Sequence, residues 1–142
     1  MKFDKAYSYV NDLLPEFDFI CSRVNIDYDV EYDRDNPDEV QKYTVLSRIM
    51  DKLDNIRGQL SYLERPVVST CELVYNPNSD RYECDYHEFH CGDPIEFLYF
   101  DDDLERYEWI CSRIEHNGDR YYIVGYRNVS LDGLKVRFRQ VC

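Results

Sequence analysis

The residues that decide the fold lie at positions 36–66 and read NPDEVQKYTVLSRIMDKLDNIRGQLSYLERP. Asn36 is a typical N-cap, Pro37 suits the first helical position, and the acids that follow place negative charge in the first turn. Apolar side chains then recur every three or four residues, at Leu46, Ile49, Leu53, Ile56, Leu60 and Leu63. The pattern predicts one helix from about Pro37 to Leu63 that stops before Pro66.

The apolar stripe of this helix, which Val40, Tyr43 and Met50 widen, fits two arrangements. Spacing of three and four residues is typical of a helix that packs in an ordinary core or in a helical hairpin within one chain. The same spacing also supports a dimeric coiled coil, but here it lasts for only about three heptads. We favour packing within one chain.

The residues before this helix show weaker helical spacing and one acidic stretch. Apolar side chains at helical intervals predict a helix over residues 3–14, which Pro15 ends or restarts, and a short second segment over 17–24. Residues 27–35 read DYDVEYDRD and alternate with the period of a strand, yet Asp is a poor strand former. We therefore expect an exposed loop or edge segment there.

After Pro66 the sequence changes to short β-type runs separated by turn clusters. Asn117-Gly118 between two aromatic-rich runs is the best hairpin pattern, and the single tryptophan, Trp109, is expected in the core. About six short strands predict a small antiparallel barrel or a strongly bent sheet. The fold class is thus α+β, with a helical region at 1–65 and a small β domain at 66–142.

Composition limits the classes of function. The 142 residues carry a net charge of −12, yet 44% are hydrophobic and 14 are tyrosine, which argues against disorder. Such acidity disfavours a nucleic-acid-binding surface and an anionic membrane surface, and it favours a basic protein partner. The first residues lack the continuous apolar core of a signal peptide, so we expect an intracellular protein in a reducing compartment.

Three of the six cysteines and two of the three histidines lie between positions 71 and 91. Cys84 and His87 are separated by two residues, a spacing that lets one turn present two ligands to one zinc ion. We predict a structural zinc site with His90 as a competing fourth ligand and with the ligand set Cys71, Cys84, His87 and Cys91. The alternative is that the cysteines are small buried hydrophobic residues and the histidines lie at the surface. No catalytic motif accompanies the cluster, so we predict a protein that is not an enzyme.

Two acidic stretches are candidate contacts for a basic partner. The first comprises Asp27, Asp29, Glu31, Asp33 and Asp35, and the second comprises Asp101, Asp102 and Asp103. Carboxylates spaced like phosphates can occupy a basic nucleic-acid channel and steer association. The alternative is that both stretches are solvated loops that keep the protein soluble.

Several short motifs resemble a small uncharacterised domain that is common in proteins of Gram-positive phages and mobile elements. These motifs are Leu73-Val74-Tyr75, Arg81-Tyr82-Glu83, Gly92-Asp93-Pro94-Ile95-Glu96, Trp109-Ile110 and Leu134-Lys135-Val136-Arg137. The resemblance covers roughly residues 50–139. In size, charge and composition the chain is similar to anti-CRISPR inhibitors of type II effector nucleases. That similarity implies an inhibitor in the bacterial cytoplasm that hinders nucleic-acid engagement, and the alternative is a zinc-stabilised accessory module.

Overall fold

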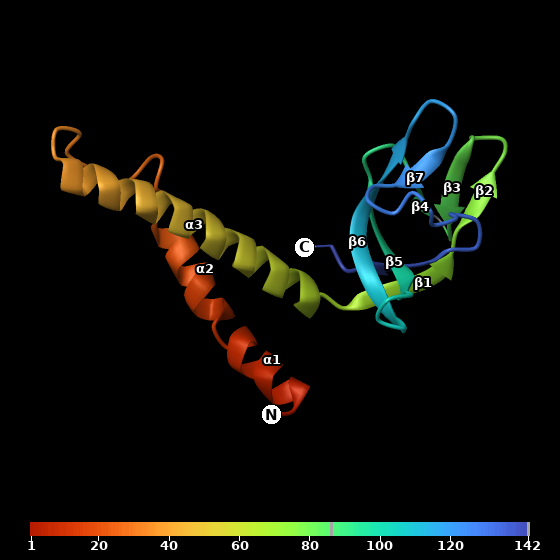
Figure 1. Ribbon diagram of the computed structural model, residues 1–142, viewed down its shortest axis with the longest axis horizontal. Coiled ribbons are helices and arrows are strands. Elements are labelled where there is room, and N and C mark those ends of the chain that lie inside the picture. The colour runs from red at the N-terminus through yellow and green to blue at the C-terminus, as the bar shows by residue number, and fades with distance from the viewer. Residues whose placement is uncertain (86, 142) are drawn as a thin grey trace. The chain divides into compact units, whose positions relative to one another are not determined.

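Helices and strands occupy separate parts of the chain in the computed structural model, which describes residues 1–85 and 87–141 (Figure 1). Two compact units result, Met1–Arg65 and Pro66–Cys142. The first unit is helical, and the described part of the second is built of strands and turns. The predicted α+β class is therefore confirmed.

Three helices form the first unit: α1 (Phe3–Asn11), α2 (Leu14–Arg23) and α3 (Pro37–Glu64). Pro15 is the second residue of α2, so it restarts the chain as a new helix. The Asn36 side chain caps α3 by accepting hydrogen bonds from the backbone N–H groups of Asp38 (3.0 Å) and Glu39 (3.4 Å). Among the residues that the structure describes, no helix combines the length and the apolarity that a membrane crossing requires.

The predicted apolar stripe of α3 is only partly covered. Met50 and Leu60 are buried, α2 packs against α3, and the Tyr7 hydroxyl of α1 donates to Glu64 (2.7 Å). Four members of the stripe remain exposed, namely Leu46, Ile49, Ile56 and Leu63. Packing within one chain thus uses one side of the stripe and leaves the other side at the surface.

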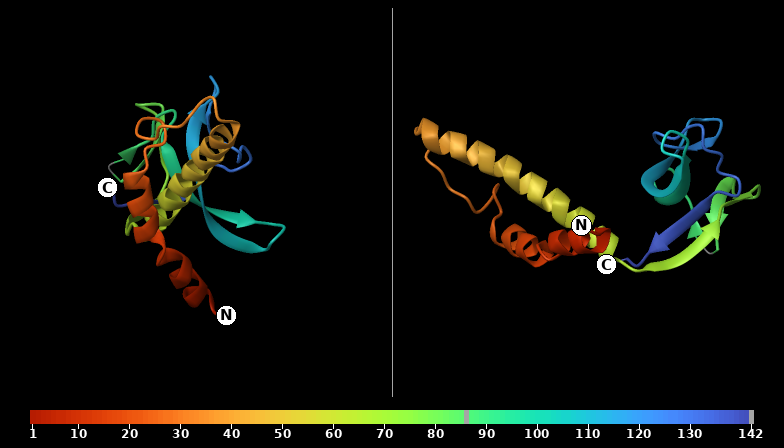
Figure 2. Two further views of the ribbon diagram at one scale, coloured as in Figure 1. Left: turned by 90° about the vertical axis from the view of Figure 1, so that its left-hand side faces the viewer. Right: turned by 60° about the horizontal axis from the view of Figure 1, so that its bottom comes forward.

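The β unit contains two antiparallel sheets (Figure 2). The five-stranded sheet has the order β1-β8-β5-β6-β7, and the three-stranded sheet has the order β2-β3-β4. The strands are β1 (Val67–Glu72), β2 (Val74–Asn76), β3 (Arg81–Cys84), β4 (His87–Glu88), β5 (Pro94–Asp101), β6 (Arg106–His116), β7 (Tyr121–Ile123) and β8 (Lys135–Arg139). The sheets are open, so the predicted barrel-like closure is wrong: β1 and β7 are the two edges of the larger sheet and do not pair with each other.

The core of the β unit lies on one face of the strands. Its buried members are Leu73, Cys84, Phe89, Ile95, Phe97, Ile114, Ile123, Leu131 and Val136. Trp109 is not among them, which corrects the prediction from sequence. Successive side chains of a strand alternate between faces, so Trp109 points opposite to Ile110, and its ring lies 4.3 Å from the Arg137 guanidinium.

The opposite face of the same sheet holds a buried charge cluster. Glu96 is 6% exposed, and its carboxylate lies 2.7 Å from Arg137 and 3.2 Å from Arg139. Arg137 is the cross-strand neighbour of Glu96 in the pairing of β5 with β8. The two arginines thereby compensate the negative charge of Glu96, which would otherwise be costly to bury in the sheet.

Candidate acidic interface and cysteine cluster

The second acidic stretch lies at the tip of the β5–β6 hairpin. β5 and β6 pair from Pro94↔Arg113 to Asp101↔Arg106, and residues 102–105 form the turn. One Asp101 oxygen accepts hydrogen bonds from the backbone N–H groups of Asp103 (2.9 Å) and Leu104 (3.1 Å), as in an Asx turn. Asp101 therefore shapes the turn, while Asp102 and Asp103 are exposed.

Aromatic side chains flank these carboxylates. Phe100 and Tyr107 are exposed at 42% and 67%, and their ring centroids lie 4.9 Å apart across the hairpin. Tyr99 is half-buried, and its pKa is raised by burial and by the negative charges of Asp101, Asp102 and Asp103. The hairpin tip therefore combines negative potential with exposed apolar area.

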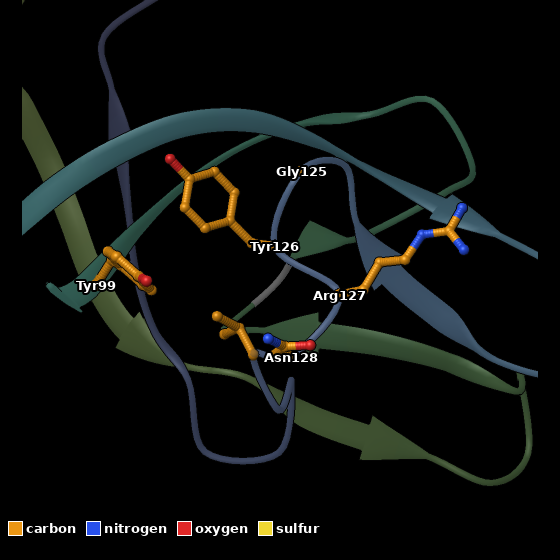
Figure 3. A pocket seen from close by; sticks show the side chains of 6 residues that line it. Tyr99, Gly125, Tyr126, Arg127 and Asn128 are labelled. Atoms are coloured by element: carbon orange, nitrogen blue, oxygen red, sulfur yellow. The ribbon is translucent and has the colours of Figure 1, made fainter. Parts of the chain in front are cut away.

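A pocket opens beside Tyr99 (Figure 3). Its volume is about 380 Å³, and it is lined by Tyr99 and the segment 125–129 that follows β7. Tyr126 packs edge-on against Tyr99 (5.1 Å between centroids) and against the buried ring of Phe97 (5.2 Å). The ring contacts of Tyr126 with Phe97 and Tyr99 of β5 are long-range and carry no signal in the local sequence.

The first acidic stretch is a loop of the helical unit, as predicted, because residues 27–35 form turns and no strand. Buried Ile26 anchors the loop through its carbonyl, which accepts from the Tyr43 hydroxyl (3.1 Å), and Tyr32 stacks on Tyr43 (4.0 Å). The five acidic side chains of the stretch are exposed, although Asp33 also accepts from the backbone N–H of Asp35. The loop thus presents carboxylates outward from a packed base.

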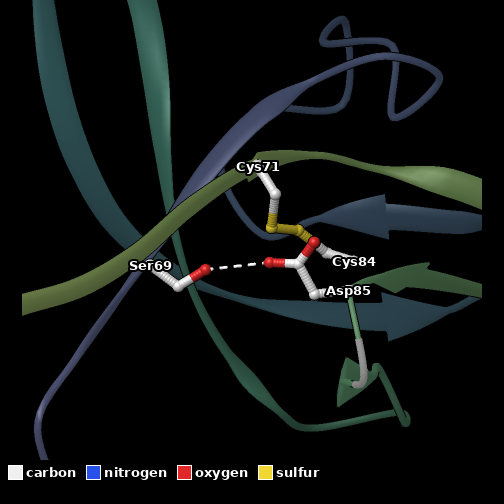
Figure 4. Close-up of a disulfide and its surroundings, with 4 residues drawn as sticks. All are labelled: Ser69, Cys71, Cys84 and Asp85. Carbon is white, nitrogen blue, oxygen red and sulfur yellow. Dashed lines mark hydrogen bonds between the residues drawn. A yellow bond between two sulfur atoms is a disulfide. The ribbon is translucent and has the colours of Figure 1, made fainter.

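The structure brings together two of the four predicted zinc ligands. Cys71 of β1 and Cys84 of β3 form a disulfide with 6.1 Å between their Cα atoms (Figure 4). Asp85, whose φ of 52° is left-handed, lies beside them and accepts from the Ser69 hydroxyl (2.9 Å). One ligand atom each from Cys71, Cys84 and Asp85 lies within 4.8 Å of the others.

His87 of β4 is the cross-strand neighbour of Cys84, whereas Cys91 lies farther along the chain, beside Glu115. His87 is exposed and contacts the rings of Phe89 and Phe138. The thiol of Cys91 donates to Glu115 (2.8 Å), which raises the pKa of Cys91 and lowers that of Glu115. His90 lies 3.3 Å from Glu88. In the part of the chain that the structure describes, the predicted set of four is not assembled, and sequence analysis missed Asp85.

Comparison with known proteins found a family model that matches part of the β unit. Residues 71–138 match the model of a domain of unknown function, DUF5348. This match covers the larger part of the region that resembles an uncharacterised small domain in sequence. The comparisons found no matching curated protein and no matching solved structure.

Proposed function

We propose that this protein is an acidic inhibitor that binds a basic protein and occupies the surface with which that protein engages nucleic acid. The observation that carries the proposal is the tip of the β5–β6 hairpin, where exposed carboxylates adjoin the exposed rings of Phe100 and Tyr107. Carboxylates complement a surface rich in Lys and Arg and accelerate association with it. Aromatic side chains supply the contact area that such interfaces favour.

The partner that we propose is a type II CRISPR effector nuclease in the bacterial cytoplasm. Such a nuclease holds the guide–target heteroduplex in a positively charged channel, which an acidic protein can occupy. The net charge of −12 and the similarity in size and composition to anti-CRISPR inhibitors support this choice. In this mechanism the protein hinders nucleic-acid engagement, catalyses no reaction and binds no nucleic acid itself.

The test is inhibition of DNA cleavage by a purified effector. The wild-type protein should inhibit at a near-stoichiometric ratio, and association should slow as salt is raised. The double variant Asp102→Lys, Asp103→Lys should associate more slowly, because it reverses the exposed charges and leaves the turn-forming Asp101 in place. The control is Glu72→Lys with Asp119→Lys, which makes the same charge change at exposed positions outside this hairpin. Equal loss in both double variants, or no inhibition by the wild type, would contradict the proposal.

The loop at 27–35 receives a separate test. Asp27→Lys, Asp29→Lys and Glu31→Lys together reverse three exposed charges without touching Asp33, which forms a turn hydrogen bond. If the helical unit contacts the partner, this triple variant slows association as well. Association at the wild-type rate would assign the contact to the β unit.

A second candidate function is a zinc-stabilised accessory module without inhibitory activity. The observation that favours it is the grouping of Cys71, Cys84 and Asp85, because thiolates and carboxylates are zinc ligands. A zinc ion and a disulfide exclude each other at these sulfur atoms, so the metal requires reduced cysteines. Protein purified under reducing conditions should then contain about one zinc per chain. A chelator and Cys84→Ser should each lower Tm, whereas the control Cys21→Ser should not; metal-free reduced protein would rule the site out.

A further inference from the structure

The pocket beside Tyr99 has aromatic walls that the core holds in place. Phe97 is fully buried, and the rings of both Tyr99 (6.4 Å) and Tyr126 (5.2 Å) pack edge-on against it. The backbone of the lining segment is also held by hydrogen bonds. The Tyr126 N–H donates to the Ile123 carbonyl (2.9 Å), and the Val129 N–H donates to the Tyr126 carbonyl (3.1 Å). The two rings are therefore ordered before any ligand arrives, which lowers the entropic cost of binding.

The surroundings of the pocket are negative. Asp101 follows Tyr99 by two residues along β5, so the two side chains share one face of the sheet. Burial raises the pKa of Tyr99, and the negative charges of the three hairpin-tip aspartates raise it further. A cation at this wall is attracted and an anion is repelled.

The one positively charged lining residue does not fill the pocket. The guanidinium of Arg127 lies 4.7 Å from the ring of Tyr122. In Figure 3 its side chain extends away from the rings of Tyr99 and Tyr126. Arg127 thus leaves the rings of Tyr99 and Tyr126 to a cation supplied from outside.

We propose that this pocket receives an arginine side chain of the basic partner. A guanidinium stacks on aromatic faces and also pairs with carboxylates. Tyr99 and Tyr126 line the pocket, and Asp101 lies two residues from Tyr99 on the same face of β5. The inference rests on the proposed function, because the partner supplies the arginine. The pocket would add selection of one arginine side chain of the partner. Steering by net charge alone accelerates association but does not select one side chain.

The test is an NMR titration of the full chain with short peptides that each contain one arginine, lysine or citrulline. The amide chemical shifts of the protein report binding. The arginine peptide should shift the amides of residues 99 and 125–129 in a saturable way. Citrulline has the same shape as arginine without the charge, so the citrulline peptide should bind at least about fivefold more weakly than the arginine peptide. Equal shifts with the citrulline peptide would overturn the proposal.

Two variants at one position separate the aromatic contribution from folding. Tyr126→Phe retains the ring and should retain arginine binding, whereas Tyr126→Leu should lose it. The double variant Asp102→Asn, Asp103→Asn leaves the pocket lining intact and should bind the arginine peptide more weakly. High salt should weaken the binding of the same peptide to the wild type in the same way. If Tyr126→Leu is unfolded, the Asp pair decides: unchanged arginine affinity in that variant would contradict the inference.

The effector assay keeps this inference distinct from the proposed function. Tyr126→Leu should weaken inhibition while Tyr126→Phe does not. Full inhibition by a folded Tyr126→Leu variant would overturn the pocket and leave the acidic inhibitor standing. Saturable arginine binding without inhibition of any effector would overturn the proposed function and support the pocket as an arginine site.

Discussion

Neutralising Glu96 tests how the larger sheet is stabilised. The Glu96 carboxylate is 6% exposed and lies 2.7 Å from Arg137 and 3.2 Å from Arg139. The two arginine side chains are themselves only 19% and 11% exposed. Glu96→Gln keeps the size of the side chain and leaves two buried cations opposite a neutral amide.

The expected loss of stability follows from that geometry. Removing one partner of a buried ion pair costs roughly 3–5 kcal/mol, because the remaining charge is left uncompensated. The glutamine oxygen still accepts one hydrogen bond, and Arg137 still lies over the ring of Trp109, so we expect about 3 kcal/mol. In a domain of this size about 1 kcal/mol moves Tm by roughly 4–8 °C, which gives a fall of roughly 12–24 °C.

Trp109 makes the measurement specific to the β unit. It is the only tryptophan of the chain and lies in β6, so its fluorescence during urea denaturation follows this unit and not the helices. The control is Glu72→Gln, an exposed carboxylate on β1 of the same sheet, for which we expect a change within about 0.5 kcal/mol. A Glu96→Gln variant no less stable than this control would refute the argument that the ion pairs compensate a buried charge.

Three further predictions concern the cysteines and the cap of α3. The Cys71–Cys84 disulfide should protect both sulfur atoms, so in denatured, unreduced protein these two residues should resist alkylation until a reductant is added; their alkylation without reductant would contradict the disulfide. Glu115→Ala removes the carboxylate whose hydrogen bond, and to a smaller extent whose charge, raises the pKa of Cys91, so Cys91 should be alkylated at lower pH in mass spectrometry over a pH series. An unchanged profile would show that Glu115 does not set the pKa of Cys91. Asn36→Ala should destabilise the helical unit by about 1 kcal/mol in far-UV circular dichroism melts, because two N–H groups lose their acceptor; an unchanged melt would show that the cap is dispensable.

Features set by neighbouring residues could be predicted from the sequence. Helix α3 begins at the predicted Pro37 and ends within one residue of the prediction, because its N-cap, its first-turn proline and the following Pro66 are all local determinants. The Asn117-Gly118 hairpin also lies where predicted, between β6 and β7, with the Asn117 side chain accepting from Asp119 and Arg120 N–H groups. In both cases the determining contacts span only a few residues.

Features set by distant pairing could not be predicted. Glu96 interrupts an apolar run, and only its pairing with Arg137, 41 residues away, explains its burial. Cys91 lies close to Cys84 in sequence, but the turn around Asp93 takes it to Glu115 on β6. The same long-range register turns Trp109 away from the core and leaves the sheet open.

Strand β5 separates the buried ion pairs of Glu96 from the wall of the proposed arginine pocket. Its alternation sends Glu96 to one face, where two arginines hold it, and sends Phe97, Tyr99 and Asp101 to the other. Along that second face the side chains pass from the buried core at Phe97 to the exposed hairpin tip, so the core positions the pocket wall beside the acidic turn. Changes at the tip should therefore alter association and leave the unfolding of the β unit unchanged, whereas changes at Glu96 should do the reverse. Such opposite effects would show that the buried ion pairs of Glu96 and the hairpin tip act independently.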